Sequence, residues 1–501
     1  MAAFPSLLLL TSSALAIALS RRRAVWRTAA AAAASFAAAL TLLLLGDRVP
    51  VRTLLSVWRP VALFGDGLLL TLDDLAWPVA FIVCTLPLIA LLQRIGSQPL
   101  EGPDLAGALA GAGLGVAALL ASNLLSLMVA WSLMGASRMA WTILRGRPEG
   151  KPADLARVGG QEIAPPLLLM LAGFVEQMAG GTASLEAPMR GTLGAVVFGA
   201  AVLARALPAA SASGNTGPAL VEGLAFRLLP AAVALTSLGR QLISGVPQAA
   251  LGWGALGGAL VVGSGIVRWL GASWSDDRNA ALAWTLVGVG VLAAWLVPAG
   301  STALAAAALL LLACGIQAAQ QAQHRWQRLW PAVSSVAVAG VPGSPGAGVL
   351  MAIASADLAW AVVAAPLAFV AFGLWRPDSA GRLGPQARVS ARVSGADLAC
   401  LALALSAVVS GLRQSWSGNW QLSAVIALPA AAGAWLAARR GWPRPVSVGS
   451  RELQRAWVRL VRALLSVFEW SARGLAGLFE GRAGMLWMFL LVLVGWLALR
   501  G

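Results

Sequence analysis

Charged residues are scarce in this sequence of 501 residues: Asp, Glu, Lys and Arg make up 11% of it, against about 25% in an ordinary soluble domain. Hydrophobic residues make up 59%, and the mean hydropathy is +0.79. A water-soluble globule of this size could not hide so much apolar surface, and disordered chains are poor in apolar residues. The composition therefore excludes a soluble enzyme and a disordered chain, and it predicts a polytopic membrane protein.

Side chains that bind metals or carry redox chemistry are also scarce. The three cysteines, Cys84, Cys314 and Cys400, lie in apolar segments without CxxC spacing, and His324 is the single histidine. Such cysteines are typical of small buried hydrophobic residues rather than of a metal site or a disulfide framework. The sequence also lacks a Walker loop, a GxSxG elbow and an HExxH motif. We therefore predict no metal, no cofactor and no catalytic site in this chain.

Lysine is nearly absent, because Lys151 is the only one, and arginine carries almost all of the basic charge. The formal net charge of +16 would suggest a nucleic-acid partner in a soluble protein. Here the arginines lie mostly between apolar stretches, which is the pattern of the positive-inside rule. We therefore predict the lipid bilayer as the surroundings of the chain, and no nucleic acid.

Apolar runs of the length that crosses a bilayer recur along the whole sequence. They predict an all-α fold with about 14–16 transmembrane helices. The sixteen candidate spans lie near residues 3–19, 29–45, 76–92, 105–121, 123–143, 162–178, 190–207, 219–239, 250–270, 280–298, 301–319, 332–353, 357–375, 398–412, 420–438 and 484–500.

The arginine-rich loops set the expected orientation. With every span counted, they fall on one side of the membrane, which should be cytoplasmic. The N-terminus is then outside, in a bacterial-type inner membrane. The loops are Arg21–Arg27, Arg145–Arg157, Arg325–Arg328, Arg376–Arg392 and Arg439–Arg455.

One stretch near the C-terminus has the pattern of a surface helix rather than of a span. In residues 451–470 apolar side chains recur at helical spacing, while arginines and Glu469 fill the other face. This pattern predicts an amphipathic helix along the membrane surface, followed by a last span from Met485. It is either a plain linker or a connector that docks on a neighbouring subunit.

Three stretches carry a resemblance to a known family: residues 123–137, 217–240 and 277–285. Together they resemble the antiporter-like L, M and N subunits of respiratory complex I, whose fold also occurs in Mrp antiporters and membrane hydrogenases. The resemblance implies two inverted five-helix repeats, each with a broken helix. It also implies four parts: N-terminal helices (1–104), an antiporter-like core (105–353), C-terminal helices (354–440), and the surface helix with the last span (441–501).

The same resemblance implies a proton relay whose usual residues are replaced in this chain. The family has a glutamate paired with a lysine in a broken helix, followed by further Lys or His residues. Lysine suits a relay because burial lowers its pKa until it can release a proton. The matching positions hold Ser132, Leu203, Phe226 and Asn279. An arginine cannot take over, because its pKa stays above about 12.

Several charges remain as candidates for a polar axis or ion path. Arg205, Glu222 and Arg227 lie around the predicted helix break, and His324 follows a glutamine-rich stretch. They either form a remnant polar path or lie at helix ends and reach the membrane interface.

Other charged residues have simpler expected roles. Glu176 and Asp357 are expected at the outer surface, and Asp277 is expected to cap a helix. Arg240 is expected to anchor a helix end. Arg138 either pairs inside the bundle or reaches the interface.

Three functions follow as hypotheses. The first is a membrane-arm subunit of a complex I-like or hydrogenase-like assembly, structural or conducting ions through atypical residues, with other membrane subunits as partners. The alternative is the membrane component of an ion-coupled transporter, such as an inorganic-carbon uptake system with a soluble partner. The third is an unrelated transporter whose motifs match by chance.

Overall fold

The computed structural model describes residues 2–18, 24–56, 67–93, 102–144, 152–211, 228–271, 275–297, 302–306, 309–310 and 345–356. The chain divides into two compact units, Met1–Trp442 and Pro443–Gly501, and all described residues belong to the first. The expected surface helix at 451–470 and the candidate spans beyond residue 356 lie outside the described residues.

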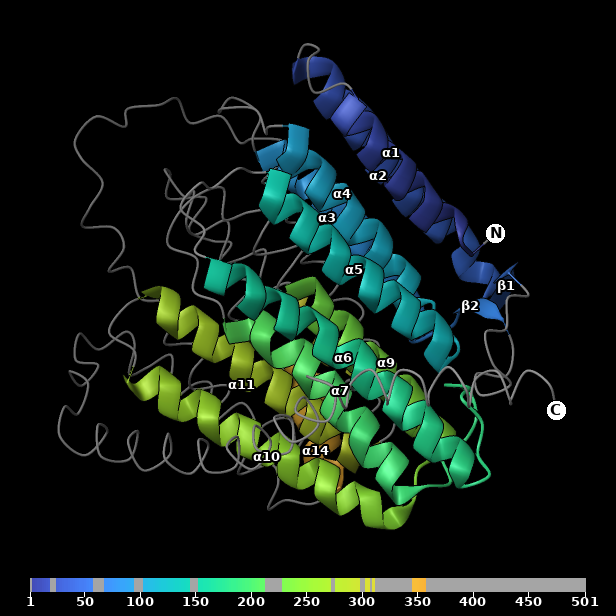
Figure 1. Cartoon of the computed structure of the whole chain (residues 1–501), viewed down its shortest axis with the longest axis vertical. Helices are drawn as coiled ribbons and strands as arrows, with labels where there is room; N and C mark the ends of the chain where they lie inside the picture. Colours follow the sequence, from blue (N-terminus) through green and yellow to red (C-terminus); the bar gives the residue numbers. More distant parts are fainter. Residues whose placement is uncertain are drawn as a thin grey trace, which may run out of the picture. The chain divides into compact units, whose positions relative to one another are not determined.

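Long helices make up most of the described chain (Figure 1). Neighbours in sequence pack against each other, as α4 does with α5, α5 with α6, α6 with α7 and α10 with α11. The helices are α1 (Phe4–Ala18), α2 (Ala24–Leu45), α3 (Ala76–Gln93), α4 (Gly102–Leu119), α5 (Leu124–Leu144), α6 (Pro152–Met178), α7 (Thr192–Ser211), α9 (Leu229–Ser244), α10 (Gln248–Gly271), α11 (Ser275–Leu296) and α14 (Pro345–Ala356).

Within the described part, three helices are long and apolar enough to cross a membrane: Trp26–Arg48, Gly102–Leu119 and Gln248–Arg268. Four shorter apolar helices accompany them, at Phe4–Ala18, Ala76–Leu88, Thr192–Leu207 and Ala280–Leu296. The expectation of an all-α polytopic membrane protein is therefore confirmed.

Two helix boundaries differ from the expected ones by about ten residues. α6 begins at Pro152 rather than near 162, because its first turns are polar and an apolar run does not reveal them. α9 begins at Leu229 rather than near 219. α7 continues to Ser211, a few residues beyond the expected end of the span near residue 207.

A small β-hairpin interrupts the helical pattern after α2. Its strands β1 (Val51–Ser56) and β2 (Leu68–Leu72) pair antiparallel. The hairpin belongs to a loop layer, defined here as residues 46–56, 67–75, 120–123, 179–191 and 245–247.

Backbone hydrogen bonds join the segments of the loop layer. The N–H of Thr71 donates to Leu120 O (2.6 Å), that of Leu124 to Ala183 O (2.8 Å), and that of Met189 to Gly245 O (2.9 Å). Since α2, α4, α6 and α9 end in this layer and α3, α5, α7 and α10 begin in it, consecutive helices alternate in direction.

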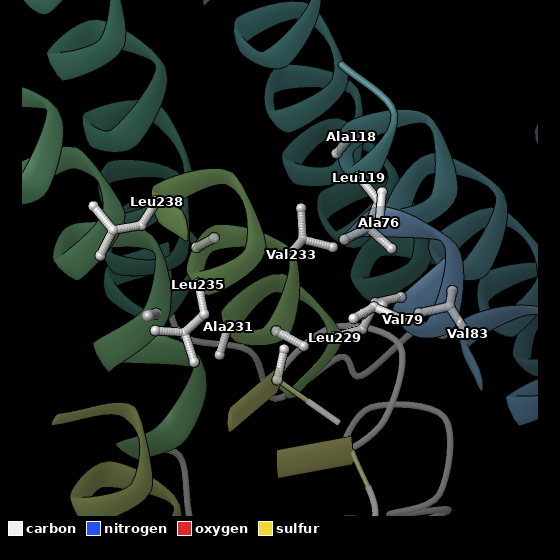
Figure 2. Close-up of a cluster of buried hydrophobic side chains, with 14 of the residues drawn as sticks. Ala76, Val79, Val83, Ala118, Leu119, Leu229, Ala231, Val233, Leu235 and Leu238 are labelled. Atoms are coloured by element: carbon white, nitrogen blue, oxygen red, sulfur yellow. The ribbon is translucent and has the colours of Figure 1, made fainter. Parts of the chain in front are cut away.

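Helix α9 lies at the centre of the packing. Its residues from Leu229 to Leu242 are all buried, and it contacts α3, α4, α7 and α11. Figure 2 shows Val233 on the side toward Ala76 and Leu119, with Leu235 and Leu238 on the other side. A helix that is buried all round is typical of the interior of a bundle.

Glycines bring α10 and α11 into close contact. A Cβ atom on Gly258 would lie 2.7 Å from the backbone nitrogen of Leu292, and one on Gly254 would lie 2.0 Å from the Trp295 ring. On the facing helix, a Cβ on Gly288 would lie 2.6 Å from the nitrogen of Val262. Small residues permit this approach of two backbones, which stabilises helix pairs in membranes.

We predict that Gly258→Val separates α10 from α11 and lowers stability. The backbone of Leu292 has no room to move, and overpacking of this kind costs about 1–3 kcal/mol. Thermal unfolding of the purified protein in detergent measures the effect. Gly252→Val is the matched control, because nothing lies within 4 Å of a Cβ atom there on the same helix. Equal unfolding temperatures for the two variants would contradict the prediction.

Candidate functional site

A buried carboxylate joins two arginines from neighbouring helices. Glu162 of α6 accepts a hydrogen bond through Oε1 from Arg138 Nη1 of α5, at 2.5 Å. Its other oxygen, Oε2, accepts one from Arg205 Nη1 of α7. The side chains of Glu162, Arg138 and Arg205 are 7%, 11% and 4% exposed. We call Arg138, Glu162 and Arg205 the charge triad; it links three consecutive helices.

The spacing of residues on α5 explains how the triad forms. Trp131, Gly135 and Arg138 follow at intervals of four and three residues, so they share one face of the helix. A Cβ atom on Gly135 would lie 3.0 Å from Glu162 Cβ and 3.1 Å from its Oε2. The missing side chain therefore leaves room for the carboxylate. The guanidinium carbon of Arg205 lies 6.0 Å from the centre of the Trp131 ring, at cation–π distance.

The chemistry of the triad is that of fixed positive charges around one carboxylate. A buried charge is costly unless it is paired and hydrogen-bonded, which accounts for the close contacts of Glu162. Both of its partners are guanidinium groups, which do not release protons in proteins. The triad therefore ties α5, α6 and α7 together without offering a lysine that could pass a proton on.

The structure assigns Arg205 a partner that the sequence did not suggest. The other candidates for the polar axis, Glu222, Arg227 and His324, lie outside the described residues, as does the substituted position Phe226. Of the two alternatives for Arg138, pairing inside the bundle is confirmed.

Of the other positions where the family residues are replaced, the structure describes the side chains of Ser132 and Leu203. Ser132 is exposed, and its hydroxyl donates to Met128 O at 2.8 Å. Leu203 is partly buried and packs against the hydrophobic core. Asn279 lies in α11, where only its backbone is described.

Sequence reasoning missed Glu162, the central residue of the triad. The expected span began at residue 162, so Glu162 fell at its first position, close to an arginine-rich loop, and not inside the bundle. The true start of α6 at Pro152 places Glu162 ten residues into the helix. One sequence feature could have indicated a buried carboxylate. On α5, Trp131, Gly135 and Arg138 share a face, and the glycine leaves room there for a carboxylate that pairs with Arg138.

Glu176 was expected at the outer surface, and this is wrong. It is 0% exposed. Its carboxylate accepts hydrogen bonds from the backbone N–H groups of Arg190 (2.5 Å) and Gly191 (3.1 Å), just before α7 begins. A carboxylate at a helix N-terminus accepts hydrogen bonds from free N–H groups and interacts favourably with the positive end of the helix dipole. Glu176 thus joins the end of α6 to the start of α7.

Arg240 does more than anchor a helix end at the interface. It is 5% exposed, and its Nε donates to Asp73 Oδ2 at 2.7 Å. Its Nη1 donates to Ala121 O and its Nη2 to Thr71 O, at 3.4 Å for the latter. Arg240 therefore fastens α9 to the loop layer.

The structure says less about the two other carboxylates with expected roles, Asp277 and Asp357. Asp277 lies within the first turn of α11, which begins at Ser275, and not at the cap position itself. Asp357 lies outside the described residues.

Comparison with known proteins places this fold. No protein-family model matches the sequence, and none of the curated proteins matches it. Among solved structures, the Mrp complex from Dietzia sp. DQ12-45-1b contains a chain similar to this one, with a TM-score of 0.71 at 18% identity. The match covers 100% of this chain and 62% of that chain, so this chain spans less than two thirds of that neighbour's length.

A second similar structure is the membrane-bound sulfane sulfur reductase, an archaeal respiratory membrane complex. The TM-score is 0.65 at 16% identity, and the match covers 97% of this chain and 99% of that chain. The class is therefore a polytopic helical membrane protein. More particularly, the fold is that of the antiporter-like subunits of the complex I and Mrp type, as the three sequence stretches predicted. An unrelated transporter fold is excluded.

We predict that Glu162→Ala destabilises the protein strongly. It removes the described carboxylate partner of the buried Arg205, and breaking such a buried pair costs about 3–5 kcal/mol. Unfolding in detergent, followed by circular dichroism, measures the loss. Glu186→Ala is the control, because Glu186 pairs with Arg52, whose side chain is 65% exposed; a pair of this kind contributes about 0–1 kcal/mol. A loss for Glu162→Ala no larger than that of the control would show that the triad does not hold the helices together.

Proposed function

We propose that this chain is a membrane-arm, antiporter-like subunit of a complex I-like or hydrogenase-like assembly, without the usual lysine-based proton relay. Its role is structural, or it conducts ions through atypical residues. The observation that carries the proposal is the charge triad. Among the described residues, the buried carboxylate of Glu162 is held between two arginines, Arg138 and Arg205, and not beside a lysine.

A carboxylate paired with arginines cannot do what a carboxylate paired with a lysine can do. A relay needs a group that binds and releases a proton as its surroundings change. A guanidinium keeps its proton, so Arg205 stabilises a neighbouring carboxylate without passing the proton onward. The single lysine of the chain, Lys151, belongs to the arginine-rich region before α6 and not to an apolar run. These points support a subunit that has kept the fold and lost the common chemistry.

The neighbouring structures support partners of a particular kind. The similar chains belong to an Mrp complex and to a respiratory membrane complex, which are assemblies of several membrane subunits. We therefore propose other membrane subunits as partners of this chain. The arginine distribution supports a bacterial-type inner membrane, with the N-terminus outside.

We expect no proton flux through the isolated chain. The purified protein is placed in liposomes with a pH-sensitive dye inside, and an imposed potential drives any proton entry. Wild-type protein should match empty liposomes, and a protonophore added afterwards shows that the dye responds. Flux that disappears in Glu162→Gln, Glu222→Gln or His324→Ala would reveal a rebuilt proton path and would contradict the loss of pumping.

We also expect the chain to purify with membrane subunits of an oxidoreductase. An affinity-tagged chain, extracted from its native membrane in mild detergent, should migrate far above its own mass of 51.2 kDa on a native gel. Mass spectrometry of that band should identify quinone oxidoreductase or hydrogenase subunits. A band containing one large soluble zinc protein would instead favour the inorganic-carbon transporter.

A further inference from the structure

Two buried hydrogen-bond donors beside the charge triad have no acceptor within the part of the chain that the structure describes. They are the Nε–H of Arg205 and the indole Nε1–H of Trp131. Trp131 is 0% exposed and Arg205 is 5% exposed. An unmade hydrogen bond at a buried donor costs about 1–3 kcal/mol, and more for a charged group. Two such donors in one place indicate an acceptor that does not belong to the described chain.

Both donors belong to one neighbourhood. The guanidinium carbon of Arg205, to which Nε is bonded, lies 6.0 Å from the centre of the Trp131 ring. Trp131 also shares its helix face with Arg138, two turns further along α5. The donors therefore lie on the edge of the triad, between α5 and α7.

The charges around Arg205 indicate the character of the missing acceptor. Each carboxylate oxygen of Glu162 accepts a hydrogen bond from a different arginine, Oε1 from Arg138 and Oε2 from Arg205. Arg205 binds its oxygen through Nη1, so it does not form the two-pronged pair that a guanidinium makes with a whole carboxylate. Its Nε side has no acceptor among the described residues. In a region of low dielectric constant, an incompletely neutralised guanidinium attracts a second negative charge strongly.

We propose that Arg205 and Trp131, at the edge of the charge triad, form a binding site for one small monovalent inorganic anion of the size of chloride. The near-complete burial of both side chains favours an ion of one or a few atoms over an organic carboxylate. The anion accepts hydrogen bonds from Arg205 Nε and Trp131 Nε1 and supplies the charge that the shared Glu162 does not. The site lies within the proposed functional site, but binding is measured without flux or partner subunits. The two proposals can therefore fail separately.

The test compares thermal unfolding of the purified chain in sodium gluconate and in sodium chloride at constant ionic strength. A ligand that binds the folded state raises the unfolding temperature in a concentration-dependent way. We expect chloride to give a saturable rise for wild-type protein and for Arg52→Gln. Arg52 is the matched control, because its side chain is 65% exposed in a surface ion pair.

Three variants should change the chloride-dependent rise in unfolding temperature in different ways. Arg205→Gln should abolish the chloride-dependent rise, and Trp131→Phe, which keeps a ring and removes the N–H, should raise the half-saturating concentration several-fold. Glu162→Gln should lower that concentration several-fold, because the anion then takes the place of the lost carboxylate charge. This last variant retains a test even where Arg205→Gln fails to fold.

Two results would overturn the proposal. Equal unfolding temperatures in chloride and gluconate, for both wild-type protein and Glu162→Gln, would assign the two donors to bound water. A chloride effect that stays unchanged in Trp131→Phe and Arg205→Gln would place the anion elsewhere on the protein.

Discussion

The need to pair charge inside an apolar bundle governs this structure. Each buried charged group that the structure describes in detail is placed so that it joins separate parts of the chain. Glu162 joins α5, α6 and α7 through two arginines. Glu176 closes the junction between α6 and α7, and Arg240 fastens α9 to the loop layer. In an apolar interior an unpaired charge would be costly, so these contacts fix how the helices meet.

Close packing between small residues also holds the helices together. The buried helix α9 has apolar neighbours on every side, and the glycines of α10 and α11 let two backbones approach closely. Lipid offers no hydrophobic drive for helices to associate, so such shape fitting stabilises the bundle instead. Polar pairing thus selects which helices meet, and small residues determine how near they come.

The same arrangement of helices is compatible with very different side chains. The structural neighbours share the arrangement of helices at 18% and 16% identity, which leaves most side chains free to differ. In this chain the buried carboxylate of Glu162 comes from α6, and both of its described partners are arginines. The charge triad joins α5, α6 and α7, and the Nε–H of Arg205 has no acceptor among the described residues.

The sequence by itself determined the membrane class, most helix positions and the loss of lysine from the bundle, because these follow from composition and from runs of apolar residues. The antiporter-like fold also followed from the order of three short stretches. Only the tertiary structure decided that Glu162 is the partner of Arg205, since the two are 43 positions apart and lie on different helices. It likewise showed that Glu176, which was expected at the surface, lies in the interior. Helical periodicity specifies a face of a helix, whereas the facing residue on another helix depends on packing.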